Sequence, residues 1–161
     1  MPTADVASAI LGRLRVLLLG LVALGAVGLT LELLLLEHWE EWRQWTPLVI
    51  LTCTALGAAA VAWRPGTGVL RGFRTLMLLS VVSGGLGSFF HYESNAELER
   101  EIHPDLSGPS LVRAALGGGT PTLAPGAMIQ LGLLGLLAVY RHPAGRSSRS
   151  SKPIQGSSHD A

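Results

Sequence analysis

The sequence predicts an all-α fold, an integral membrane bundle of four transmembrane helices with a short amphipathic helical lid between spans three and four. Four apolar stretches are long enough to cross the roughly 30 Å hydrocarbon layer of a bilayer. Only 14% of the residues are charged and 48% are hydrophobic, whereas about a quarter of a soluble domain is charged. We therefore assign residues 1–145 to one transmembrane domain and residues 146–161 to a disordered basic cytoplasmic tail.

The first span covers about 16–36 and is interrupted only by Thr30 and Glu32. At 1.5 Å per residue it reaches about 30 Å. This run is longer than the apolar region of a cleavable signal peptide, so we expect an uncleaved span. The second span covers about 46–63, with Pro47 in the first turn, where a missing amide hydrogen does no harm.

The third span covers about 73–92, and the fourth covers about 123–140, with Pro125 in its first turn. Small residues at helix interfaces allow neighbouring backbones to approach closely. We therefore expect close helix contacts at the glycines of spans one, three and four: Gly20, Gly25, Gly28, Gly84, Gly87, Gly132 and Gly135.

The loop 93–122 is the largest piece outside the predicted spans. Ser94 and Glu97 have the spacing of a capping box, which predicts the start of a short helix that Pro104 ends. A second short helix is expected over 111–116, followed by three glycines. Apolar residues recur at helical spacing in this loop, so we expect a lid on the bundle or on the membrane surface.

The orientation follows from the basic residues beside the spans. Lys and Arg are enriched in cytoplasmic loops. One side holds nine: Arg13, Arg15, Arg64, Arg71, Arg74, Arg141, Arg146, Arg149 and Lys152; the other holds Arg43, Arg100 and Arg113. Both termini are therefore expected to be cytoplasmic, in the plasma membrane of a bacterial cell. Trp39, Trp42 and Trp45 recur beside the exterior end and predict an aromatic belt.

The candidate site lies at the exterior end and comprises Glu32, His38, His91, Glu93 and Glu97. Antiparallel spans bring their exterior ends to one level, so His38 and His91 meet if spans one and three pack together. Imidazole and carboxylate suit zinc, iron or manganese. In the alternative interpretation, the histidines cap helix C-termini and the acids lie outside by default. Glu32 is either a proton relay or cation ligand, or a partner in an interhelical hydrogen bond to Ser80, Ser83, Thr52 or Gln130.

Three functions remain open on the sequence alone. We favour an accessory or structural subunit without catalytic activity of its own, because the sequence contains no catalytic constellation. The alternatives are a metal- or proton-handling protein that uses the Glu/His site with a divalent metal ion, and an electron carrier with haem between His38 and His91. The expected partners are the lipid bilayer and another membrane protein or a second copy of the chain. A net charge of +1 provides no basic field for nucleic acid.

Overall fold

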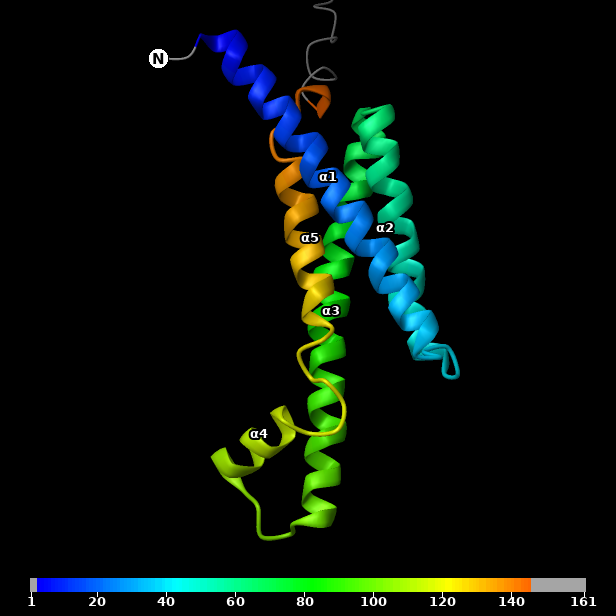
Figure 1. Cartoon of the computed structure of the whole chain (residues 1–161), viewed down its shortest axis with the longest axis vertical. Coiled ribbons are helices and arrows are strands. Elements are labelled where there is room, and N and C mark those ends of the chain that lie inside the picture. The colour runs from blue at the N-terminus through cyan, green and yellow to red at the C-terminus, as the bar shows by residue number, and fades with distance from the viewer. Residues whose placement is uncertain (1–2, 146–161) are drawn as a thin grey trace, which may run out of the picture.

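The computed structural model describes residues 3–145, and these residues form helices and turns without a strand (Figure 1). The predicted tail, 146–161, lies outside the described residues. The described residues contain five α-helices and two short 3-10 helices: α1 (Ala4–Leu35), η1 (Trp42–Gln44), α2 (Trp45–Trp63), α3 (Thr67–Ile102), α4 (Gly108–Leu116), α5 (Gly126–Ala138) and η2 (Pro143–Gly145). The all-α class is therefore confirmed.

Four of the helices pack in a ring, in which α1 contacts α2, α2 contacts α3, α3 contacts α5 and α5 contacts α1. Figure 1 shows that the N-termini of α1 and α3 lie at the same end as the C-termini of α2 and α5. Three segments are long and apolar enough to cross a membrane: α1, Trp42–Trp63 and α3. The regular part of α5 is apolar but shorter, with 13 residues.

The first two spans differ in how closely the sequence predicted them. Helix α1 begins at Ala4 rather than at about residue 16. No proline lies between Ala4 and Leu35, and Ala, Leu and Arg all favour the helix, so it extends beyond its apolar part. Helix α2 matches the predicted span 46–63 to within one residue.

Helix α3 does not end at the predicted span, and the prediction of a separate helix starting at Ser94 is wrong. The helix runs unbroken through 36 residues to Ile102, about 54 Å. Neither proline nor glycine occurs between Gly87 and Pro104, and mid-helix amides already have partners, so Ser94 has no unpaired amide to cap. Pro104 ends the helix as predicted. About 20 residues cross a bilayer, so α3 extends well beyond the apolar length.

The segment predicted as the fourth span is built differently from the three long apolar segments. Only Gly126–Ala138 is regular α-helix, about 20 Å long. Tight i to i+3 turns continue it in both directions, from the Ala124 amide to the Pro121 carbonyl (3.1 Å) and from the His142 amide to the Val139 carbonyl (3.3 Å). A 3-10 turn rises about 2.0 Å per residue, so these turns lengthen the fourth segment at both ends.

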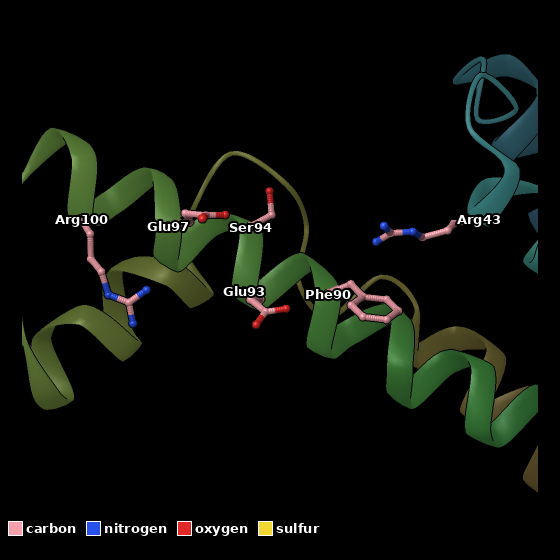
Figure 2. A pocket seen from close by; sticks show the side chains of 6 residues that line it. All are labelled: Arg43, Phe90, Glu93, Ser94, Glu97 and Arg100. Atoms are coloured by element: carbon pink, nitrogen blue, oxygen red, sulfur yellow. The ribbon is translucent and has the colours of Figure 1, made fainter.

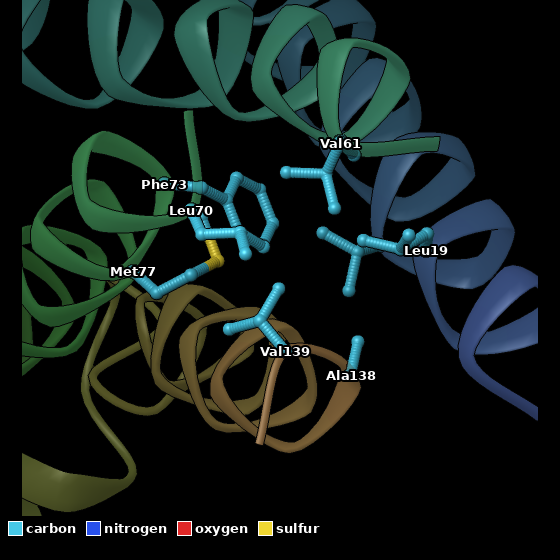
Figure 3. Close-up of a cluster of buried hydrophobic side chains, with 9 residues drawn as sticks. Leu19, Val61, Leu70, Phe73, Met77, Ala138 and Val139 are labelled. Carbon is cyan, nitrogen blue, oxygen red and sulfur yellow. The ribbon is translucent and has the colours of Figure 1, made fainter. Parts of the chain in front are cut away.

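The interior is apolar and closely packed between the four helices. One cluster of buried side chains lies toward the N-terminus of α1 (Figure 3): Leu19, Val22, Ala58, Val61, Leu70, Phe73, Met77, Ala138 and Val139. A second cluster toward the other end comprises Ala26, Leu51, Met128 and Leu131. Each of these helices thus contributes to the core.

Glycines make the contact between α3 and α5 possible. A Cβ at Gly132 would lie 2.7 Å from the Met77 carbonyl oxygen, and one at Gly84 would lie 2.7 Å from the Pro125 carbonyl oxygen. The predicted close contacts are confirmed at five glycines: Gly25, Gly84, Gly87, Gly132 and Gly135. They are wrong at Gly20 and Gly28, around which the structure has no atom within 4 Å of an added Cβ.

Helix α4 packs along the side of α3 beyond the end of the four-helix ring (Figure 1). The predicted second short helix is therefore present, with Pro109 in its first turn. Its packing as a lid over the bundle is not confirmed, because its buried side chains, Leu111 and Ala115, belong to the contact with α3. We call residues 91–116 the outer arm.

Candidate functional site

Glu32 lies on an exposed face of α1, less than one turn before Leu35. It makes none of the predicted interhelical hydrogen bonds within residues 3–145. Thr52 donates instead to the Leu48 carbonyl of its own helix at 2.8 Å. The Ser80 hydroxyl is buried without any hydrogen-bond partner in this part of the chain. Glu32 therefore does not stabilise the bundle through a polar contact between helices.

His38 and His91 are within electrostatic range of each other. The helices before and around them, α1 and α3, run parallel and lie diagonally across the ring, and they are not one of its contacting pairs in residues 3–145. His38 follows α1, where its amide donates to the Leu33 carbonyl at 2.9 Å. His91 lies on α3, half-buried, close enough to His38 for the two rings to repel each other when both are charged. Within residues 3–145, however, no group of three or more His, Cys, Asp or Glu side chains is placed to hold a metal ion. The structure thus gives the metal centre no support.

The other two predicted residues, Glu93 and Glu97, line an open cleft of about 350 Å³ between the α1–α2 connection and α3 (Figure 2). The sequence did not identify the other lining residues: Arg43, Phe90, Ser94 and Arg100. The α3 residues recur at intervals of three or four and therefore share one helix face. Because α3 continues past Ser94, this face is longer than the prediction allowed.

Arg43 reaches the cleft from η1. The Gln44 side chain accepts a hydrogen bond from the Glu41 amide at 3.2 Å, which closes this short turn. The Arg43 guanidinium carbon then lies 6.0 Å from the Phe90 ring centroid and 5.8 Å from that of Trp42. Both distances fit cation–π interactions, so Arg43 connects the α1–α2 connection to α3.

The other charged side chains of the cleft, Glu93, Glu97 and Arg100, are exposed to solvent and form no hydrogen bond or ion pair within residues 3–145. Ser94 lines the same cleft as Glu93 and Glu97, but its hydroxyl forms no hydrogen bond to either carboxylate within residues 3–145. Unpaired charges on a fixed helix are suited to binding a group of complementary charge.

The opposite side of α3 contains a buried polar network centred on Asn95. Its amide nitrogen donates to the Ala115 carbonyl at 2.9 Å, to the Thr120 carbonyl at 2.7 Å and to the Thr122 hydroxyl at 3.1 Å. Its amide oxygen accepts from the backbone amide of Thr120 at 3.1 Å and from the hydroxyl of the same residue. One side chain thus joins α3 to the end of α4 and to the α4–α5 connection.

The glycine-rich connection is shaped around this asparagine. A Cβ at Gly118 would lie 2.7 Å from Asn95 Cγ, so only glycine allows the backbone this close. Asn95 and the neighbouring Ala96 are 3% and 2% exposed. From the sequence alone, Gly117–Gly119 mark the end of a short helix and a hinge between the lid and the fourth span. Asn95 and Thr120 are 25 positions apart in the sequence. Nothing in the sequence pattern shows that their side chains meet in the folded chain.

Comparison with protein-family models, with curated protein sequences and with solved structures gave no match for this sequence. The outer arm and the cleft are therefore the features of the molecule that bear on its function.

Proposed function

We propose that this chain is a small four-span membrane protein with both termini cytoplasmic, and that it serves as an accessory subunit whose outer arm binds another membrane protein. The observation that carries the proposal is the outer arm itself. It is an extension of a membrane-length helix, held by a buried polar network, and it carries exposed charged and apolar side chains. Helix α5 with its flanking turns supplies the fourth span beside the three long apolar segments.

Charge supports the orientation. At the end formed by the N-terminus of α1, the described residues include one acid, Asp5, and six arginines. The arginines are Arg13, Arg15, Arg64, Arg71, Arg74 and Arg141. The other end holds nine acids and three arginines, the acids being Glu32, Glu37, Glu40, Glu41, Glu93, Glu97, Glu99, Glu101 and Asp105. Under the positive-inside rule, the arginine-rich end is cytoplasmic.

The surface of the outer arm supports a role in binding. Leu98, Ile102, Val112 and Leu116 are 47%, 58%, 43% and 48% exposed, although they lie beyond the length of α3 that a bilayer covers. Leu98 and Ile102 lie one turn apart on α3, and Val112 and Leu116 lie one turn apart on α4. Exposed apolar side chains of this kind outside a membrane favour a contact with another protein. The acids on the same arm favour a partner with a basic surface.

The binding proposal is tested with a photo-crosslinking amino acid placed at Ile102 or Val112 in intact cells. A matched position at Glu40, exposed at the same end but outside the arm, is the control. We expect one discrete crosslinked species from the arm positions and none from Glu40, and the species identifies the partner by mass. Equal crosslinking at all three positions would contradict a specific contact.

The orientation is tested separately in a Cys53→Ser background. A membrane-impermeant maleimide should label Asp105→Cys in intact cells and Arg64→Cys only after the cells are opened. The reverse pattern would overturn the proposed topology without affecting the fold.

Metal or proton handling is the second candidate, and the proximity of His38 to His91 is what favours it. Elemental analysis of the detergent-purified protein beside His91→Ala tests it, and a Soret band in the same sample tests haem. Near-stoichiometric metal that the variant lacks would place this function ahead of the accessory role. We expect the purified protein to contain far less than one metal ion per chain and to show no Soret band.

A further inference from the structure

Two arginines from different helices meet at the C-terminal end of α5, at the end of the molecule opposite the outer arm. Arg15 on α1 donates from Nη2 to the Tyr140 and Arg141 carbonyls at 3.3 and 3.4 Å. Arg74 on α3 donates from Nη2 to the Val139 carbonyl at 3.0 Å. Carbonyls at the end of a helix lack partners within the helix, so both guanidinium groups are positioned by the fold.

The positive charge here exceeds what the helix end can balance. A helix C-terminus carries about half a negative charge, against two full positive charges. The only acid at this end of the described residues is Asp5, about 15 Å before Arg15 along α1. The pKa of His142 is lowered, first by burial and then by the charges of Arg15 and Arg74. These three side chains therefore lie around one unbalanced positive region.

The same side chains keep free donors of the type that phosphate requires. Within residues 3–145 each arginine uses only Nη2, which leaves Nε and Nη1 without a partner. His142 Nδ1 accepts from the Ala144 amide at 3.3 Å, so the neutral ring carries its hydrogen on Nε2 and can donate it. The guanidinium fork matches phosphate oxygens in pairs.

The depth of this region fits a lipid headgroup. Trp63 and Tyr140 are 86% and 62% exposed at the same end, and exposed Trp and Tyr mark the level of the membrane interface. The Arg141 guanidinium carbon lies 5.6 Å from the Tyr140 ring centroid, so charge and aromatic side chain share this level. A phosphate attached to a lipid reaches this depth directly.

We propose that Arg15, Arg74 and His142 form a binding site for the phosphate of an anionic phospholipid headgroup in the cytoplasmic leaflet. The proposal rests on the membrane orientation proposed above, but not on the accessory role. Basic regions between transmembrane helices on the cytoplasmic side bind acidic headgroups in general.

The test is lipid retention by the full chain in detergent, measured by native mass spectrometry, together with the thermal shift on lipid addition. Phosphatidylglycerol is compared with phosphatidylcholine and with inorganic phosphate. We expect retention of phosphatidylglycerol alone and, for Arg15→Gln or Arg74→Gln, about tenfold weaker retention, the loss of one charged hydrogen bond. The matched controls are Arg13→Gln and Arg71→Gln, which remove the same charge from the same helices without touching α5.

Each shift is measured against the same variant without lipid, so a change in basal stability does not enter the result. Arg15→Lys and Arg74→Lys keep the charge and should retain an intermediate amount of lipid. Equal loss in the control variants would reduce the site to general surface charge and overturn the proposal. Equal shifts with phosphatidylcholine, or an equal shift with inorganic phosphate, would overturn the assignment to an anionic lipid. The lipid assay is done in micelles and tests only the phosphate site. The maleimide and crosslinking experiments are done in cells and test the orientation and the accessory role, so a failure of one proposal can be told from a failure of the others.

Discussion

Between residues 90 and 102, α3 has one face packed on the α4–α5 segment and one face open to the cleft. The packed face buries Asn95 with partners for both its amide nitrogen and its amide oxygen. The open face carries Glu93 and Glu97 exposed and without a partner in residues 3–145. A fully satisfied buried network contributes stability, whereas exposed charges contribute little. The packed face thus determines the shape of the outer arm, and the open face is left for recognition.

Of the substitutions that test this difference between the two faces, Asn95→Ala should lower the free energy of unfolding the most. It removes five side-chain hydrogen bonds and leaves the buried Ala115 carbonyl and Thr122 hydroxyl with fewer partners, at a cost of about 3 kcal/mol. Unfolding in a fixed detergent measures the change, and faster exchange of the Thr120 amide locates it. Glu97→Gln, on the open face, should change stability by less than about 0.5 kcal/mol. Similar losses in both variants would remove the distinction between the faces.

Gly118→Ala should have the next largest effect. Its Cβ would lie 2.7 Å from Asn95 Cγ, so the connection must shift away from α3, which costs about 1–3 kcal/mol. Gly119→Ala is the matched control, because an added Cβ there meets no atom within 4 Å. The same unfolding measurement separates them. Equal stability of the two variants would show that the close approach to Asn95 is not required.

On the open face, Arg43→Gln should have a smaller effect. The cation–π contact with Phe90 contributes about 0.5–1 kcal/mol at an exposed site. A double-mutant cycle with Phe90→Leu isolates this contribution from other effects of each change. Strict additivity of the two single changes would mean that the cleft is not bridged by this pair in solution.

The smallest effect concerns pH and the half-buried His142 at the arginine-rich end. Burial and two arginines lower the pKa of His142 in the folded chain. As pH falls below about 6.5, the unfolded chain takes up this proton first, so folding stability decreases. His142→Gln should reduce the drop in melting temperature between pH 7.5 and 5.5. An identical drop in wild type and variant would argue against the assignment.

The sequence predicted the features that depend on local pattern. The apolar stretches located α2 to within one residue, and Pro104 ended α3 because proline cannot continue a helix. Gly84 and Gly132 predicted close helix contacts, although the sequence did not show that α3 and α5 are the helices that meet there. In each case the information lies in the residue itself or in its immediate neighbours.

The features that depend on distant residues were not predictable from the pattern. Ser94 and Glu97 have capping-box spacing, but the preceding turn of α3 already pairs their amides. Asn95 and Thr120 are separated by 25 positions, so only the folded chain shows that they meet. The cleft likewise needs Arg43 from a different segment. Glu93 and Glu97 were thus identified as charged exterior residues, while the side chains around them were not.

The unbroken length of α3 has a mechanical consequence. A continuous α-helix resists bending, and between Phe89 and Ile102 α3 has neither a proline nor a glycine at which to kink. A force applied to the outer arm would therefore be transmitted along the helix axis to the stretch 83–88, where Gly84 and Gly87 contact Pro125. This stretch pairs glycine with serine, a composition at which helices bend. Tilting the arm would bend α3 there and press on the start of α5.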